Sequence, residues 1–224
     1  MFDNCFNFNS KLHIGNNASN TYRLLSTSPN FNKEVYLGSN LKNMYEMFNN
    51  CTKFSKELII PDSVINCIGM LNYCPKFNRS VHIGNSVTDA QNLFIYSPNL
   101  EYPVYIGLSV ENTYRMCNTC INYSKDVTLP DSVLNCLYMF NDNGYYNGNV
   151  HIGEGVTNTY RLFSNLKYMN SNVYIGGNVR NTYEMFINCF NFSKDITIPD
   201  SVLNVHNMFN NCENFKANVN VGNN

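Results

Sequence analysis

The chain has 224 residues, a net charge of −1 and only 14% charged residues, so it lacks the electrostatic signature of a nucleic-acid or anionic-membrane partner. No apolar run approaches the length of a membrane-spanning helix, and membrane insertion of this segment is not expected. Hydrophobic residues make up 44% of the chain, which is enough for a substantial core. The composition therefore indicates a folded chain and argues against binding to nucleic acid or to an anionic membrane.

A repeat of 23 residues runs through the whole chain without insertion or deletion. Nine complete units cover residues 12–218 and partial units lie at both ends, so one solenoid domain is predicted over residues 1–224. Units also recur in groups of three, which gives a second period of 69 residues. Repeat positions 1 to 23 are counted from Leu12, Val35, Leu58, Val81, Val104, Val127, Val150, Val173 and Ile196.

Both ends of the array fall inside a unit. Terminal units of solenoids usually need polar caps, because each unit buries its faces only against its neighbours. We therefore expect the chain to be a piece of a longer array, or to be capped by another segment. Uncapped ends would also allow end-to-end contact between arrays.

Each unit begins with a predicted short strand. Positions 1 and 3 are apolar in every complete unit, as in Ile196 and Ile198, whereas position 2 is mostly polar or aromatic. This alternation is typical of a strand with one buried face, and stacked units would pair such strands into a parallel sheet. Gly or Pro at position 4, as in Gly176 and Pro199, ends the strand in a turn.

The rest of each unit is predicted to return to the next strand through a turn and a short helical or 3-10 segment. Position 9 is Asn in eight units, which favours a turn whose side chain satisfies backbone groups of adjacent turns. Asp89, in the ninth unit, keeps the acceptor and loses the donor. Apolar residues recur at positions 13, 14 and 17, a spacing that fits a short helix opposite the strand.

The nine cysteines follow the repeat rather than a disulfide framework. Six of them occupy position 17, where other units have Ser, Asn or Leu, so this position is interpreted as a small, partly buried slot. Oxidation of neighbours such as Cys51 and Cys74 is left open. Cys117 and Cys120 have CxxC spacing, but they fall on positions 14 and 17 and are interpreted as core residues.

No catalytic or metal-binding motif is evident in the sequence, so the chain is predicted not to be an enzyme and to need no cofactor or metal. Asp62, Asp131 and Asp200 recur in a Pro-Asp-Ser turn, where a turn or cap role explains them. The histidines at position 2 lie three strands apart, too far for one ion whose ligands would lie about 2 Å from it.

The strand, the Asn turn and the period resemble a leucine-rich repeat. The segment ITIPDSV resembles the BspA-like leucine-rich repeats of bacterial surface proteins. The segment NVRNTYEMFINCFNF is similar to the MF-x-x-C repeats of surface lipoproteins in low-GC bacteria. The resemblance implies a right-handed coil with a parallel sheet on its concave face and short helical or 3-10 segments on its convex face. It also implies a cell-surface or extracellular protein used for adhesion.

The outward column of the concave face is the expected binding surface. Position 2 follows the order His, Tyr and Ile or Thr three times, which would form a periodic aromatic stripe suited to sugar rings or an extended protein segment. The alternative is that these residues are simply well suited to an exposed sheet. The predicted binding residues are His13, Tyr36, His82, Tyr105, Thr128, His151, Tyr174 and Thr197.

Two functions remain open from the sequence. The first is a non-catalytic binding or adhesion module that recognises a protein or glycan through this face. The second is a structural spacer or virion component, such as part of a phage tail or fibre, whose role is reach or assembly.

Overall fold

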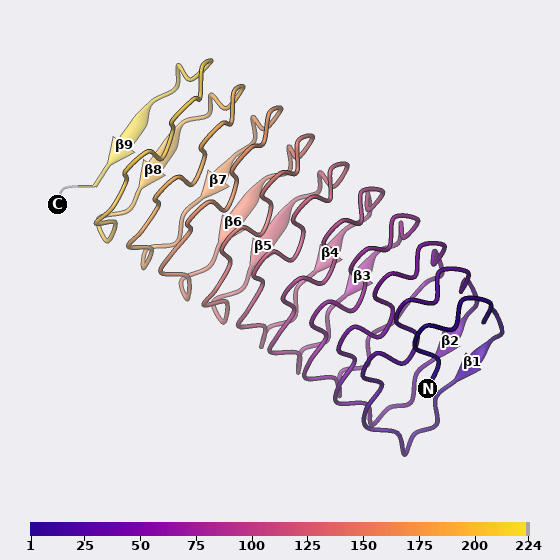
Figure 1. Ribbon diagram of the computed structural model, residues 1–224. Coiled ribbons are helices and arrows are strands. Elements are labelled where there is room, and N and C mark those ends of the chain that lie inside the picture. The colour runs from indigo at the N-terminus through magenta and orange to yellow at the C-terminus, as the bar shows by residue number, and fades with distance from the viewer. Residues whose placement is uncertain (223–224) are drawn as a thin grey trace.

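The computed structural model describes residues 1–222 and shows the repeat as a stack of coils, with the first and last strands at opposite ends of the array (Figure 1). Residues 223–224, at the end of the predicted domain, lie outside this part. The predicted strand lies at the start of every complete unit except the one that begins at Leu58, where no strand is assigned. The strands are β1 (Leu12–His13), β2 (Val35–Tyr36), β3 (Val81–His82), β4 (Val104–Tyr105), β5 (Val127–Leu129), β6 (Val150–Ile152), β7 (Val173–Tyr174), β8 (Ile196–Ile198) and β9 (Val219–Val221).

Paired strands run parallel, with equivalent repeat positions opposite each other. Leu12 pairs with Val35, and the other strand pairs keep the same register. Strands β5, β6 and β8 each show a buried, exposed, buried pattern. The predicted period-two alternation is therefore confirmed, and position 2 faces outward. We call this outward column, position 2 of every coil, the strand face.

The sheet is interrupted once in every group of three coils. Pairing joins β1 to β2, β3 to β4, β5 to β6 and β7, and β8 to β9. A break precedes each coil with proline at position 4, namely Pro61, Pro130 and Pro199. Where position 4 is Gly222, its N–H donates back to the Ile198 carbonyl at 3.0 Å. Proline has no N–H to make that bond, so the 69-residue period also appears as a periodic break in the sheet.

Positions 10 to 17 form a run of turns opposite the strands, which we call the turn side. The expected helical or 3-10 segment is not confirmed, because the φ angles at positions 12 and 16 are positive in every complete coil, as at Glu184 (55°) and Asn188 (61°). A helix requires negative φ at every residue. The alternation turns every second N–H toward the next coil, so that Glu184 donates to the His206 carbonyl at 3.1 Å.

The remaining N–H groups of the turn side bond within their own coil. The N–H of Met185 donates to the carbonyl of Thr182 at 3.1 Å, three residues back. This local bond explains why the apolar spacing suggested a helix. The structure thus keeps single 3-10-type turns while using half of the backbone donors to join neighbouring coils.

The position 9 side chain is an acceptor in all nine complete coils. Asn181 Oδ1 accepts the N–H of Tyr183 at 3.0 Å, and Asp89 Oδ1 accepts the N–H of Gln91 at 3.0 Å. The side-chain oxygen therefore accepts a backbone N–H of its own coil rather than one of an adjacent turn. Contact with adjacent coils comes from backbone bridges along this column and from amide pairs such as Asn181 with Asn158, whose Nδ2 and Oδ1 are 3.0 Å apart.

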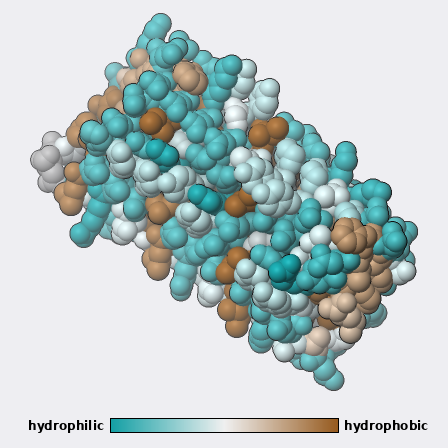
Figure 2. All heavy atoms as spheres, in the orientation of Figure 1, coloured by the Kyte–Doolittle hydropathy of each residue, from teal (hydrophilic) through white to brown (hydrophobic). Residues whose placement is uncertain are grey.

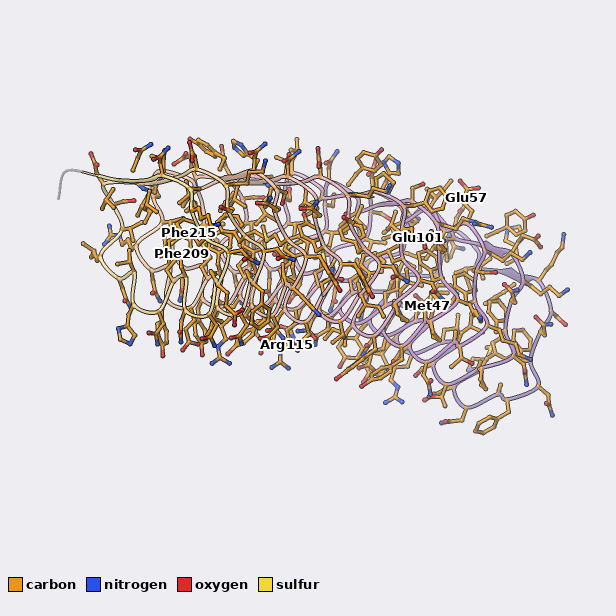
Figure 3. All side chains as sticks on the ribbon, turned by 90° about the horizontal axis from the view of Figure 1, so that it is seen from above. Met47, Glu57, Glu101, Arg115, Phe209 and Phe215 are labelled. Carbon is orange, nitrogen blue, oxygen red and sulfur yellow. The ribbon has the colours of Figure 1, made fainter. Side chains whose placement is uncertain are left out.

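Aromatic side chains stack along the core between the strands and the turn side. Phe209 and Phe215 lie inside the coil with ring centroids 4.7 Å apart, whereas Arg115 points outward (Figure 3). Phe186 stacks on Phe192 at 4.3 Å and on Phe209 of the next coil at 5.5 Å. The result is a ladder of rings that joins coils by burial of apolar surface, in two runs separated between Phe94 and Tyr123.

Position 17 contains a hydrogen-bond donor that links neighbouring coils. The Cys189 thiol donates to the Phe163 carbonyl (2.8 Å), and the Ser97 hydroxyl donates to the Leu71 carbonyl (2.9 Å). Cys and Ser exchange at this position because both are small donors. All nine cysteines are free, and Cys117 is fully buried as a core residue.

Candidate functional site

All eight residues predicted for binding lie on the strand face with exposed side chains. The register of the paired strands places equivalent positions side by side, so the column is continuous within each paired group. Tyr36, Tyr105 and Tyr174 are 52%, 51% and 52% exposed. Each ring therefore packs along one side and leaves about half of its surface available.

Each tyrosine of this column packs against the histidine of the preceding coil. The ring centroids of His82 and Tyr105 are 4.3 Å apart with an interplanar angle of 20°, and those of His151 and Tyr174 are 4.4 Å apart at 9°. His13 and Tyr36 are more open, at 5.6 Å and 36°. The strand face thus carries three two-ring platforms, which we call the His–Tyr pairs.

Residues of the third coil type separate the His–Tyr pairs. Thr128 lies opposite His151 in the register of β5 and β6, so Thr128, His151 and Tyr174 form one row on a three-stranded sheet. Thr197 lies beyond the break between β7 and β8 and pairs with Asn220. The predicted residues therefore lie in one column, but the breaks in the sheet divide that column into separate groups of two or three neighbouring side chains.

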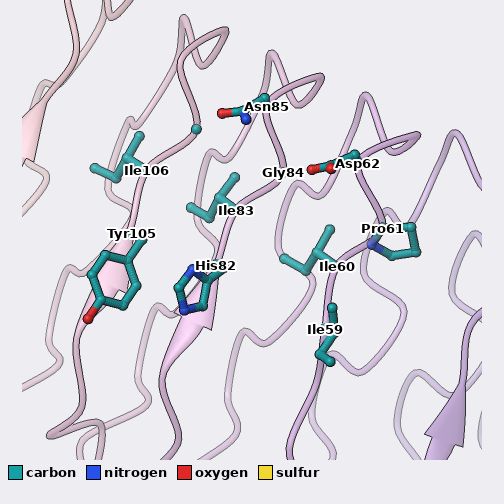
Figure 4. A pocket seen from close by; sticks show the side chains of 11 residues that line it. Ile59, Ile60, Pro61, Asp62, His82, Ile83, Gly84, Asn85, Tyr105 and Ile106 are labelled. Atoms are coloured by element: carbon teal, nitrogen blue, oxygen red, sulfur yellow. The ribbon is translucent and has the colours of Figure 1, made fainter.

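Shallow hollows accompany the breaks in the sheet. One hollow, of about 360 Å³, is lined by Ile59, His82 and Tyr105, with Asp62 and Asn85 at its polar edge (Figure 4). Figure 4 shows His82 and Tyr105 side by side, with Ile59 of the preceding coil on the other side of His82.

A second hollow, of about 390 Å³, has Tyr174, Thr197 and Pro199 among its lining residues. Both hollows therefore combine an exposed tyrosine with a coil that has proline at position 4.

Carboxylates beside the strand face are held by structural bonds. A hydrogen bond from its own backbone N–H, followed by the ammonium of Lys11, lowers the pKa of Glu34. Hydrogen bonds from the backbone and side chain of Asn218 lower the pKa of Asp195. Both carboxylates are ionised at neutral pH and bonded to the neighbouring coil. They therefore form a fixed polar edge beside the strand face.

Other titratable groups make bonds or packing contacts that stabilise the fold. Asp131 Oδ1 accepts the N–H of Glu154 in the next coil at 2.9 Å, which is a turn role. Burial raises the pKa of the Cys51 thiol to about 12, so it stays protonated at neutral pH and is a poor nucleophile. Within residues 1–222, no group of three or more His, Cys, Asp and Glu side chains is placed to hold a metal ion. The same residues include no helix able to cross a membrane.

Sequence reasoning missed a third hollow, which lies away from the strand face. It has a volume of about 520 Å³ and is lined by positions 16 and 18 of four consecutive coils, including Tyr73 and Tyr96. The signal was present in the sequence, because two of these coils have Tyr at position 16 and Pro at position 18, as in Tyr73 and Pro75, where most other coils have Asn at position 16.

The face-on view shows a largely hydrophilic surface with hydrophobic side chains in separate small groups, the larger ones toward the ends of the array (Figure 2). Together with the coils and the His–Tyr pairs, this surface defines the class of the protein: a parallel β-solenoid of 23-residue repeats with an exposed aromatic column. The chain belongs to the family described as "Mycoplasma protein of unknown function, DUF285", whose model matches residues 1–103 and 151–223. This match confirms the resemblance to bacterial repeat proteins that the sequence indicated.

Two solved structures are similar to the chain. One is a leucine-rich cell surface protein from Faecalibacterium prausnitzii, with 14% identity and a TM-score of 0.42 over 96% of this chain and 79% of that one. The other is a leucine-rich repeat protein from Bacteroides ovatus, with 16% identity and a TM-score of 0.48 over 96% of this chain and 73% of that one. At these values neither likeness extends to function. No curated protein matches the chain.

Proposed function

We propose that the chain is a non-catalytic binding or adhesion module that recognises a protein or glycan through its strand face, at the cell surface. The observation that carries the proposal is the repetition of exposed His–Tyr pairs in one column. Tyr105 and Tyr174 leave about half of their surface open to solvent, although the sheet would accept smaller residues at position 2, as it does at Thr128. Flat rings of this kind provide apolar contact together with a polar tip.

The hollows beside the pairs support the same proposal. Each combines a ring with polar groups, as Tyr105 is combined with Asp62 and Asn85. Sugar rings and extended peptides both need an apolar platform with a few hydrogen-bonding groups at its edge. Because the arrangement repeats with the three-coil period, a polymeric ligand would contact several pairs at once and gain avidity.

The test replaces Tyr36, Tyr105 and Tyr174 together with Ala. A glycan array and a panel of immobilised matrix proteins first identify a ligand of the unmodified chain. Each lost ring contact is worth about 1 kcal/mol, so the triple variant should bind that ligand at least about tenfold more weakly. The free energy of unfolding should change by no more than about 0.5 kcal/mol per site, because half-exposed surface residues contribute little to stability.

A matched control replaces Tyr22, Tyr145 and Tyr168, which are also exposed tyrosines with stacked ring neighbours but lie off the strand face. This control should keep full affinity. Equal binding by the strand-face variant and the unmodified chain would show that the stripe is not the binding surface.

A further inference from the structure

The third hollow lies on a different surface from the strand face. Its main columns are Tyr73 and Tyr96 at position 16 and Pro75 and Pro98 at position 18, extended at one end by Thr119 and Ile121. The two tyrosine rings stack with centroids 4.7 Å apart at 20°, and both are nearly half exposed. We call this hollow the Tyr–Pro groove.

The fold does not require tyrosine at these positions. The φ angles of Tyr73 and Tyr96 are 53° and 55°, in the left-handed region that Asn tolerates and bulky residues avoid. Other coils place Asn at the same position, as at Asn188 and Asn211. Two adjacent aromatic residues therefore occupy an unfavourable backbone conformation at a surface where a better residue is available in the same repeat, which is typical of functional sites.

The polarity of the groove limits what it can bind. All of its lining residues are uncharged, so a charged ligand would find no partner there. The polar groups that project from the two ring columns are the tyrosine hydroxyls, and among residues 1–222 neither hydroxyl makes a hydrogen bond to a protein atom. A glycan would leave many hydroxyls unmatched against such an apolar lining, which is costly. A ligand with apolar rings and a few exposed acceptors fits better.

Proline-containing segments have this chemistry. In the polyproline II conformation their rings are apolar, and their carbonyls are acceptors without a matching proline N–H. Such segments bind in aromatic-lined grooves of other proteins. Four coils at about 4.8 Å per coil extend the groove over roughly 14 Å, which matches about five residues at about 3.1 Å per residue. We propose that the Tyr–Pro groove binds a proline-containing extended segment of a partner protein.

The test measures fluorescence anisotropy of a labelled decaproline peptide titrated with the full chain. Binding should be saturable, and a glycine–serine decapeptide of the same length should not bind. Replacement of both tyrosines, Tyr73→Asn with Tyr96→Asn, should weaken decaproline binding by about tenfold or more, since it removes both stacked rings. The thermal midpoint of this variant should be unchanged or higher, because Asn suits the positive φ.

Two further variants keep the test independent of folding. Ile121→Lys adds a charge at the groove edge and should also weaken binding, while the fold already has Lys167 at the same repeat position. Tyr145→Asn with Tyr168→Asn removes a stacked pair outside the groove, with centroids 5.1 Å apart, and should leave binding unchanged. The proposal is overturned by absence of decaproline binding up to about 1 mM, by equal binding of the Tyr73 and Tyr96 variant, or by maltohexaose binding in place of decaproline.

Discussion

The two sides of the coil stabilise the array in different ways. On the strand side, pairing involves only two or three residues per strand and is broken before Pro61, Pro130 and Pro199. On the turn side, backbone donors such as Glu184 cross to the next coil at every junction between the complete coils. Stacked rings and the donors at position 17 reinforce most of these junctions, as the contact of Phe186 with Phe209 and the bond from Cys189 to Phe163 do.

This difference indicates that the turn side holds the stack together and that the strand face is freer to vary. A strand pair of two residues in a broken sheet contributes little to stability. The fold therefore tolerates many residue types at its outward positions. The His–Tyr pairs lie on that side. Substitutions of buried residues on the turn side should therefore lower stability, whereas substitutions on the strand face should change binding and leave stability nearly unchanged.

The largest effect is expected from breaking the ring ladder. Phe186→Ala removes a fully buried ring that contacts the rings of Phe163, Phe192 and Phe209. The free energy of unfolding should fall by about 3–5 kcal/mol, which denaturant titration would measure. Tyr174→Ala, on the strand face, is the matched change and should cost about 0.5 kcal/mol or less. Similar losses for the two variants would refute the difference between the sides.

A smaller effect tests the buried thiols of the turn side. Burial raises the pKa of Cys51 from its usual 9.0 to about 12. The folded chain therefore keeps this proton while the unfolded chain loses it. The resulting stability is fully present below about pH 9 and is lost between about pH 9 and pH 12, at about 1.4 kcal/mol per pH unit.

The measurement compares the unmodified chain with Cys51→Ser from pH 8 to pH 11. Serine keeps the bond that the Cys51 thiol donates to the Leu25 carbonyl and, as at Ser28, has no titration in this range. The stability difference between the two proteins should therefore shift in favour of the variant as the pH rises above 9. If the free energy of unfolding changed with pH in the same way in both proteins, the Cys51 thiol would not have a raised pKa in the folded chain.

The smallest expected effect tests whether position 17 needs a hydrogen-bond donor. Asn143 is fully buried there, and its amide nitrogen and oxygen have no hydrogen-bond partner within residues 1–222. Asn143→Ser would supply the hydroxyl that Ser97 uses in its own coil. The unfolding free energy should rise by about 1 kcal/mol, because an unsatisfied buried amide is removed.

Leu166→Ser is the matched control for this change. It introduces the same hydroxyl at position 17 but replaces an apolar, fully buried side chain. Loss of that burial should lower the unfolding free energy by about 2 kcal/mol. A gain in both variants, or in neither, would show that the hydrogen bond is not what selects Cys and Ser at this position.

Much of the fold was predictable because the repeat presents the same pattern nine times. The strand at position 1, the outward side chain at position 2 and the acceptor at Asp89 all follow from residue types and spacing. The candidate strand-face residues were predictable for the same reason, since alternation along a strand fixes which side chain is exposed. Their role in binding stays a prediction.

The path of the turn side could not be predicted from the sequence. Apolar spacing of three and four residues is shared by a helix and by successive turns, and it does not report φ. The positive φ at residues such as Arg161 and Glu184 is imposed by bonds to the neighbouring coil. Only the stacked structure contains that neighbour.

By itself, the sequence determined the period, the number of coils and the residues that face outward, because these depend on local alternation repeated without interruption. The tertiary structure decided where the sheet breaks, how position 17 is bonded and which exposed residues form a groove. The stacking of Tyr73 on Tyr96 shows the reason, since two residues 23 positions apart become neighbours only when one coil is placed on the next.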